Sequence, residues 1–301
     1  MSSNIIENIF CCPECKSELK SKEDTGFVCS NCDKEYEYDD NLIDFGVEEQ
    51  KFANNWSGAT TQEELMIHFK KMVKEGYFRD EDIDNVFEEK DIEMIDQQSV
   101  IAIESIRKNY YSSENSITVD LATGYGSIFN SKIGQGMDFD KLKGKTIILT
   151  DLSKFVLQKV RERLKDKIKN INIIYAVCDI GKLPFKENSI DFISSVACFV
   201  NSNRGVELLN EIKRVLGNKK RLGVFEFLYE DDSRSQNYLL KDGSNIEYTT
   251  PDRFENALKK ANFSEVDINI LYTGYARMSG DILPLKEDKN IITLINAVNE
   301  K

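Results

Sequence analysis

Apolar residues in the second half of the chain form short unbroken runs that alternate with stripes at helical spacing. The runs have the length of buried strands, and the stripes repeat every three or four residues. Strands are predicted at 117–122, 146–150, 171–177, 190–199, 222–228, 266–272 and 291–298. Helices are predicted to begin at Ser153 and at Thr250-Pro251, and another to end at Gly217. This alternation predicts an α/β fold with a mainly parallel sheet, whose last strand is antiparallel.

The preceding segment, 49–115, lacks proline and is predicted to be helical. Helices are expected at 61–76, 80–89 and 91–110, the first of them begun by a capping box of Thr61 and Glu64. The only histidine, His68, has no second histidine with which to form a metal site, so a partly buried or surface position is favoured. The only tryptophan, Trp56, is expected to pack on the core.

The first 48 residues have a different pattern, with short strands between closely spaced cysteines. Cys12 and Cys15 form one Cys-x-x-Cys pair, and Cys29 and Cys32 form a second after thirteen intervening residues. Two such pairs supply four thiolates at the spacing of a tetrahedral structural zinc site. We therefore expect a zinc ribbon with these four ligands, favoured over two redox pairs, and with Cys11 as a bystander.

Composition and charge narrow the functional classes. The chain of 301 residues has a net charge of −12, and 4 lysines with 13 acidic residues give residues 1–49 a charge of −9. An acidic ribbon opposes nucleic-acid binding, which depends on Lys and Arg neutralising phosphates. No apolar run has the length of a membrane helix, and the first ten residues do not resemble a signal peptide, so a cytoplasmic location is expected.

A glycine turn follows the first predicted strand of the α/β region. Asp120 ends the strand, Gly124 and Gly126 follow it, and Asp151 ends the next strand. Such a turn lets backbone approach a nucleoside, and the carboxylate after the second strand accepts hydrogen bonds from ribose hydroxyls. A nicotinamide-dependent dehydrogenase shares this turn, but Phe129 stands where its third glycine would be.

These motifs resemble class I S-adenosylmethionine-dependent methyltransferases of the type 11 kind over residues 116–301. Asp120-Leu121-Ala122-Thr123-Gly124-Tyr125-Gly126 is similar to their first motif, with Ala122 in place of the first glycine. Asp151-Leu152-Ser153 is similar to the second motif, and Asp179-Ile180 with Leu183-Pro184-Phe185 to the adenine-binding stretch. The turn 217–221 departs from the family because it lacks paired glycines. The stretch 134–145 departs by lengthening the path between the first two motifs.

The resemblance implies a Rossmann-like, seven-stranded sheet in the order 3-2-1-4-5-7-6 with an N-terminal zinc ribbon. The cofactor-binding residues that it implies are Asp120, Ala122, Gly124, Gly126, Asp151, Leu152, Asp179, Ile180 and Val196. It divides the chain into a ribbon at 1–48, a helical connector or cap at 49–115 and a methyltransferase domain at 116–301.

Methyl transfer from a sulfonium can be catalysed by alignment alone, so the reaction dictates no catalytic residue. Residues on the substrate side are expected after the fourth and fifth strands, where Cys198, Asn201, Tyr229 and Glu230 stand. Of these, Asn201 and Tyr229 are retained as candidates. Cys198 is expected to be a buried small residue, Glu230 a solvated one, and the polar stretch 231–249 a lid.

The sequence therefore predicts a methyltransferase that uses S-adenosylmethionine on a small metabolite or natural-product intermediate and carries structural zinc. A ribosomal or transfer RNA base methyltransferase is the alternative within the class, favoured by the ribbon and opposed by its acidity. An Asn-Pro-Pro-aromatic motif for base amino groups is absent, since Val196-Ala197-Cys198-Phe199 stands there. A non-catalytic scaffold with the same fold is the alternative from another class.

Overall fold

The structure is a computed structural model, and it describes residues 3–22, 26–46, 62–76, 78–82, 89–130, 132–168, 171–202, 204–242, 245–277 and 283–301. The segment 52–56 with Trp56, the capping residue Thr61 and most of the helix expected at 80–89 lie outside these residues. The backbone of His68 lies in a helix of the described part, but its side chain is outside the described part.

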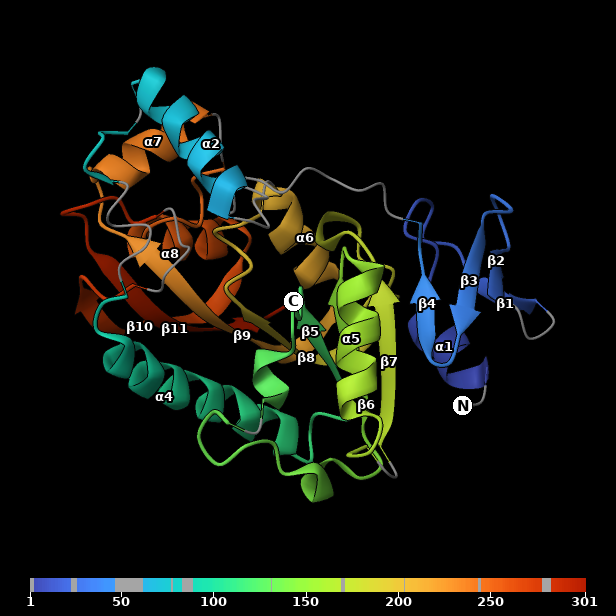
Figure 1. Cartoon of the computed structure of the whole chain (residues 1–301). Helices are drawn as coiled ribbons and strands as arrows, with labels where there is room; N and C mark the ends of the chain where they lie inside the picture. Colours follow the sequence, from blue (N-terminus) through green and yellow to red (C-terminus); the bar gives the residue numbers. More distant parts are fainter. Residues whose placement is uncertain are drawn as a thin grey trace.

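One mixed sheet runs through the molecule (Figure 1). Its described strands follow the order β1-β2-β3-β4-β7-β6-β5-β8-β9-β11-β10. The strands are β1 (Leu19–Lys22), β2 (Gly26–Cys29), β3 (Glu35–Asp39), β4 (Leu42–Asp44), β5 (Ile117–Leu121), β6 (Thr146–Asp151), β7 (Asn172–Val177), β8 (Ile190–Val196), β9 (Leu216–Tyr229), β10 (Phe263–Gly274) and β11 (Asn290–Asn299).

The part from β7 to β10 has the Rossmann-like order predicted from the sequence. β5 pairs in parallel with β6 and β8, and the final strand, β11, is antiparallel to both of its neighbours, β9 and β10. β8 is shorter than predicted and ends at Val196. β9 is longer and begins at Leu216, directly after the preceding helix, so Gly217 lies within a strand and does not form a helix-ending turn.

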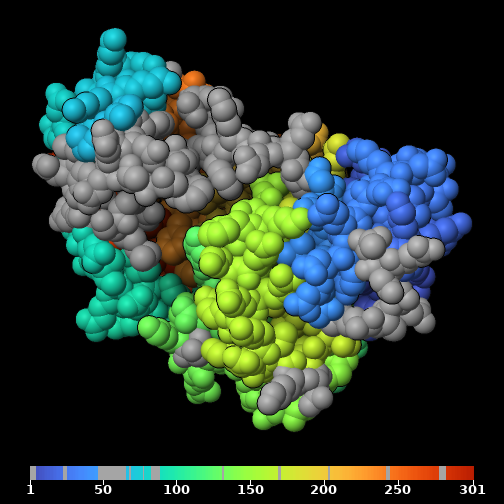
Figure 2. Space-filling model, turned by 45° about the vertical axis from the view of Figure 1, so that its right-hand side comes forward, coloured from blue at the N-terminus to red at the C-terminus, as the bar shows by residue number. Residues whose placement is uncertain are grey.

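The sheet is also larger than the seven strands that were predicted, because the N-terminal ribbon continues it. β4 lies parallel to β7, with Ile43 opposite Ala176, and the Tyr175 amide donates to the Asn41 carbonyl at 2.8 Å. Phe45 follows β4 and stacks on Phe10 with ring centroids 5.8 Å apart. The ribbon and the neighbouring part of the core form one continuous surface in Figure 2. The ribbon is therefore joined to the core by backbone pairing as well as by side chains.

Helices cover both faces of the sheet. One face packs against α4 (Ile92–Tyr111) and α5 (Lys154–Leu164), and the other packs against α6 (Gly205–Val215) and α8 (Pro251–Lys260). Ser153 and Thr250 accept backbone N–H groups at the first turns of α5 and α8, as expected for N-cap residues. The short α1 (Ser3–Ile9) packs with the ribbon.

A separate group of elements lies above one end of the sheet (Figure 1). It contains α2 (Gln62–Lys74) and α7 (Arg234–Asp242), the latter within the stretch predicted as a lid. The Tyr238 ring lies 4.9 Å from that of Phe78, and Arg234 forms an ion pair at 2.6 Å with Asp82, which is 1% exposed. The charge pair is well compensated, because Arg234 also donates to the Lys286 carbonyl.

The segment after the glycine turn differs from a dinucleotide-binding fold. Among residues 122–130 and 132–145, the only helices are the short 3₁₀ turns η1 (Ser127–Phe129) and η2 (Phe139–Leu142). A fully buried arginine of α4, Arg107, holds this segment by donating to the carbonyls of Ile128, Asn130 and Ile133. The helix that a strand–glycine turn–helix motif predicts is replaced here by side-chain hydrogen bonds.

Candidate functional site

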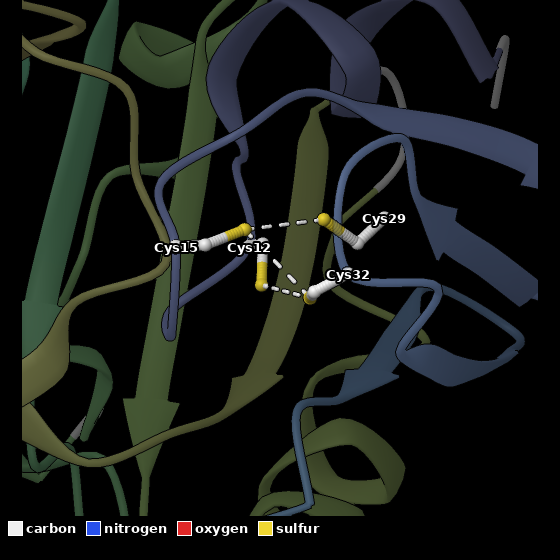
Figure 3. Close-up of side chains that lie close together, drawn as sticks. All are labelled: Cys12, Cys15, Cys29 and Cys32. Carbon is white, nitrogen blue, oxygen red and sulfur yellow. Dashed lines mark hydrogen bonds between the residues drawn. The ribbon is translucent and has the colours of Figure 1, made fainter.

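The four cysteines predicted as metal ligands converge in the ribbon (Figure 3). Their sulfur atoms all lie within 4.8 Å of one another, with Cys15 to Cys29 at 3.4 Å and Cys12 to Cys32 at 3.7 Å. Disulfide sulfurs are about 2.05 Å apart, whereas the edge of a tetrahedron with Zn–S bonds of 2.3 Å is roughly 3.8 Å. The donor set and its spacing therefore fit one zinc ion.

Neighbouring groups support this cluster. The Tyr36 hydroxyl lies 3.0 Å from the Cys12 sulfur, and the Asn31 amide donates to the Cys29 sulfur at 3.4 Å. Hydrogen bonds of this kind orient thiolate ligands. Cys11 stands outside the cluster, buried, with its backbone amide donating to the Pro184 carbonyl at 2.9 Å.

The glycine turn lies at the carboxyl end of β5. Ala122, Gly124 and Gly126 all have positive φ angles, of 48°, 50° and 73°. A Cβ atom at Gly124 would meet no heavy atom within 4 Å, so the chain leaves space beside this backbone. A left-handed turn that faces open space is what a closely approaching ligand requires.

Asp120, near the end of β5, supports the turn through a hydrogen bond to Thr123. Its carboxylate is 2% exposed and accepts hydrogen bonds at 2.6 Å from the hydroxyls of Thr123 and Ser194. The Tyr110 hydroxyl lies 2.6 Å from that of Ser194 and extends the network to α4. Burial raises the pKa of the Asp120 carboxyl to about 6. Because both of its oxygens already have protein partners, Asp120 acts on the turn through Thr123.

Asp151 faces the turn from the end of β6. One carboxylate oxygen accepts the Gly124 amide at 3.0 Å and the other accepts the Ser153 amide at 2.9 Å. Burial raises the pKa of this carboxyl. Asp151 is less buried than Asp120, and Leu152 beside it is partly exposed. The carboxylate therefore lies beside the open space at Gly124.

The third predicted acidic residue, Asp179, already has a cationic partner. Arg204, just before α6, pairs with its carboxylate through two nitrogens, and the Gly181 amide donates to it at 2.8 Å. Ile180 is 8% exposed beside this pair. Sequence reasoning missed Arg204, because its approach to Asp179 depends on how α6 packs.

A hollow of about 220 Å³ opens at the carboxyl ends of β8 and β9. It brings together the two substrate-side candidates, Asn201 and Tyr229, beside Ala197, which follows Val196. Ala197 has a φ of 54°, a second strained position next to a predicted ligand site. Its remaining lining residues are Ile95, Val200, Glu226, Phe227, Arg277, Leu283 and Asn290.

Glu226 is the most notable residue that sequence reasoning missed in this hollow. It is 1% exposed, and its carboxylate accepts the backbone amides of Phe199 at 2.9 Å and Val200 at 3.4 Å. Burial raises the pKa of the Glu226 carboxyl to about 7. A charged residue inside the apolar strand 222–228 was the signal that could have revealed it.

The other two residues after β8 and β9 behave as expected. Cys198 is buried, and burial raises the pKa of its thiol. Glu230 is partly exposed and pairs with Lys289 at 3.0 Å. Neither of them lines the hollow among the described residues.

The strand order from β7 to β10 and the glycine turn after β5 agree with what the sequence predicts for a class I methyltransferase core. Residues 120–223 match the family described as methyltransferase domain. The chain is also similar to the ubiquinone/menaquinone biosynthesis C-methyltransferases UbiE of Azotobacter vinelandii (31% identical over 111 residues) and Pseudomonas fluorescens (32% over 111 residues). Each match covers 36% of this chain and 41% of the relative, so the chain spans less than half the length of these relatives.

Solved structures with a similar chain path include methyltransferases. Phosphoethanolamine N-methyltransferase 2 of Haemonchus contortus has a TM-score of 0.48 at 15% identity, covering 66% of this chain and 52% of that one. Geranyl diphosphate C-methyltransferase of Streptomyces coelicolor has a TM-score of 0.47 at 14% identity, covering 65% of this chain and 78% of that one.

Proposed function

We propose that this protein is a cytoplasmic methyltransferase that binds S-adenosylmethionine and methylates a small molecule. The observation that carries the proposal is the site at the ends of β5 and β6. The left-handed turn at Gly124 faces open space, and the Asp151 carboxylate lies beside it. This arrangement suits a nucleoside whose ribose hydroxyls donate to a carboxylate.

The segment after this turn favours S-adenosylmethionine over a dinucleotide. A pyrophosphate is normally bound at the N-terminus of an α-helix, through free amides and the helix dipole. Directly after Gly126, the described residues 127–130 form only the three-residue turn η1 and no α-helix. S-adenosylmethionine has no phosphate, so the missing helix costs it nothing, whereas a nicotinamide dinucleotide would lose its anchor.

Each predicted cofactor residue receives a role in this proposal. Gly124, Gly126 and Ala122 shape the turn, Asp120 supports it, and Asp151 holds the ribose. Ile180 and Asp179 flank the adenine, with Leu152 and Val196 as further walls. The cofactor would supply a methyl group on a sulfonium, and the protein would contribute mainly alignment and exclusion of water.

The ribbon is proposed to hold one structural zinc ion through Cys12, Cys15, Cys29 and Cys32. A site with four protein sulfurs has no open position for substrate, so its role is to stabilise the ribbon. Zinc thiolates persist in reducing compartments, which agrees with the cytoplasm.

An RNA substrate is disfavoured by the outer face of the ribbon. Glu37, Asp39 and Asp40 expose 77–85% of their side chains there. Lys154 and Arg161 pair with these carboxylates, but residues 1–49 as a whole carry a charge of −9, which opposes the approach of a phosphate backbone. Among the described residues, no helix is both long and apolar enough to span a membrane.

The decisive experiment is calorimetric titration of the zinc-loaded protein with S-adenosylmethionine, beside Asp151→Ala and Asp140→Ala. Asp140 is an exposed carboxylate in a surface turn and provides the matched control. We expect Asp151→Ala to weaken binding at least tenfold, as the loss of a charged hydrogen-bond acceptor predicts, and Asp140→Ala to bind normally. A well-folded protein without measurable affinity for S-adenosylmethionine would instead support a non-catalytic scaffold with the same fold.

A further inference from the structure

The hollow at the ends of β8 and β9 is separate from the residues proposed to hold the cofactor. Gly124, Asp151 and Asp179 do not line it, but Ala197 and Asn201 of the loop after β8 do. Ligands of open α/β sheets bind outside the carboxyl ends of the strands. This hollow is thus the neighbouring position along the same edge of the sheet.

Asn290 supplies the polar feature that protein contacts leave unsatisfied. It stands at the start of β11 opposite Tyr229, is 6% exposed, and donates from its side chain to the Ala276 carbonyl at 3.4 Å. Its amide oxygen has no hydrogen-bond partner in the part of the chain that the structure describes. A buried acceptor without a partner costs about 1–3 kcal/mol, so a ligand that donates a hydrogen bond here would recover that cost.

The charged residues of the hollow favour a polar ligand as well. The Glu226 carboxylate is buried and faces backbone amides on the loop side, while Arg277, 2% exposed, donates to the Pro284 carbonyl at 3.0 Å. Ile95, Val200 and Leu283 form the apolar part of the wall. The hollow therefore combines an apolar surface with one negative and one positive group.

The size of the hollow limits the ligand. Its volume of about 220 Å³ lies between an engineered cavity of about 150 Å³ that binds benzene and the roughly 300–1,000 Å³ of pockets for larger ligands. One ring with a few substituents, or an aliphatic molecule of similar size, fits this volume. A longer molecule would place only one part of itself inside, because the hollow is open to the surface.

We propose that this hollow binds the methyl acceptor, that the part of the acceptor inside it is a compact polar group, and that a hydroxyl or amine of this group donates to the Asn290 amide oxygen. This assignment rests on the proposed methyltransferase function. Asn290 is a binding and specificity residue in it, and Glu226 is a positioning residue that fixes the loop 197–200.

Two measurements on the full-length protein test the assignment. In the first, a metabolite extract of the source cells is equilibrated with protein without cofactor, and retained molecules are identified by mass spectrometry. In the second, the same extract is incubated with protein and S-adenosylmethionine carrying a deuterated methyl group, and labelled products are identified. Wild type is compared with Asn290→Leu, which keeps the branching at Cγ but cannot accept a hydrogen bond, and with Asn269→Leu, the same change at an exposed position on β10.

We expect a molecule with a compact group that carries a hydroxyl or amine to be retained and to become labelled. Asn290→Leu should weaken its retention about five- to tenfold, the loss of one hydrogen bond, and Asn269→Leu should have no effect. Asn290→Leu should bind S-adenosylmethionine as wild type does, which shows that it is folded.

Three results would overturn the proposal: a labelled product without a hydroxyl or amine group, equal retention by Asn290→Leu and wild type, or neither retention nor labelling in protein that binds S-adenosylmethionine. Failure of S-adenosylmethionine binding alone would remove the proposed function. The measurement without cofactor would then still decide whether the hollow binds a compact donor.

Discussion

At the scale of single residues, the chain places two carboxylic acids in fully buried positions beside the proposed site. Asp120 is satisfied by the hydroxyls of Thr123 and Ser194, and Glu226 by backbone amides of the loop after β8. Burial outweighs these hydrogen bonds and raises both pKa values, to about 6 and about 7. Both residues therefore link proton binding to folding.

Glu226 leads to a prediction about pH dependence. Its pKa is raised from the ordinary 4.5 to about 7, so the folded state binds a proton that the unfolded state has released over that interval. Its contribution to stability is complete below about pH 4.5 and is lost as the pH rises through 7. Between about pH 5 and pH 8, wild type should lose roughly 2–3 kcal/mol more unfolding free energy than Glu226→Gln, which cannot titrate. Urea unfolding of both proteins at the two pH values measures this difference. An equal change in unfolding free energy for wild type and Glu226→Gln would contradict the prediction.

Gly124 allows a prediction that separates stability from cofactor binding. Gly124→Ala places a Cβ in the open space and forces alanine into a left-handed conformation at φ 50°. We expect a stability loss of about 1 kcal/mol from the backbone, with at least tenfold weaker binding of S-adenosylmethionine.

Gly144→Ala is the control for Gly124→Ala, since Gly144 has a φ of 78°, equally open surroundings and a position before β6 away from the site. It should lose similar stability and retain normal affinity. If the two variants bind equally well, the space at Gly124 is not where the cofactor lies.

The local sequence pattern predicted some residues of the site. The others could not be predicted, because tertiary packing brings them there. Gly124, Asp151 and Asp179 could be found because each stands at the end of an apolar run, where strand alternation sets its position. Arg204 and Asn290 reach the same edge from segments far away in the sequence, and nothing in their neighbours indicates this. Glu226 lies between these cases, because a charge within an apolar strand indicates a buried role but not its partners.

At the scale of elements, the same contrast applies. The seven core strands and their order follow from periodicity and from the resemblance. The 3₁₀ turn after β5 does not, because the buried Arg107 of α4 stabilises it through three carbonyls of the segment that follows. Likewise, the early start of β9 at Leu216 depends on pairing with both neighbouring strands. Leu216 pairs with Ile190 of β8, and Lys220 pairs with Asn299 of β11. The partition at 48 and 115 stays a prediction.

The ribbon allows a prediction at this scale. Its four sulfurs converge at distances that suit zinc, and Cys32 is the exposed member, so Cys32→Ser removes a ligand without leaving a cavity. We expect wild type to contain about one zinc ion per chain after dialysis and Cys32→Ser to contain little, since three thiolates hold zinc less tightly than four. Elemental analysis measures the metal content.

Cys11→Ala is the control for Cys32→Ser. Cys11 is buried outside the cluster, and its backbone amide contacts Pro184, so its thiol is not needed for the metal. Zinc loss in Cys11→Ala, or full retention in Cys32→Ser, would show that the ligand set is wrong.

At the scale of the whole molecule, the ribbon borders the proposed cofactor site. Lys16, directly after the Cys12–Cys15 knuckle, donates to the Leu183 carbonyl at 3.2 Å and pairs with Glu211 at 2.8 Å. Glu14 within the knuckle pairs with Lys182 at 3.2 Å. The segment 179–185, expected to flank the adenine, is therefore held from one side by the metal-binding knuckle, and β4 covers the outer edge of β7.

This arrangement predicts which parts of the chain open more often when zinc is lost. Without zinc the knuckle loses its crosslink, so the pairing of β4 with β7 and the contacts to the segment 179–185 should open more often. Hydrogen exchange measured by mass spectrometry on wild type and Cys32→Ser should show faster exchange in β7 and the segment 179–185. Exchange in β9 and β11, which pair with each other at the far side of the sheet, should be unchanged.

Comparing the exchange rates of the individual strands shows how far the loss of zinc from the ribbon affects the core. Faster exchange confined to β1–β4 would mean that the ribbon folds independently and that its pairing with β7 contributes little to the core. Faster exchange everywhere would mean that the ribbon and the core unfold as one cooperative unit. The graded result that we expect follows from the sheet order, because β4 contacts β7 directly, while β6, β5 and β8 separate that edge from β9. In that case zinc loss should also weaken binding of S-adenosylmethionine while leaving the far half of the sheet folded.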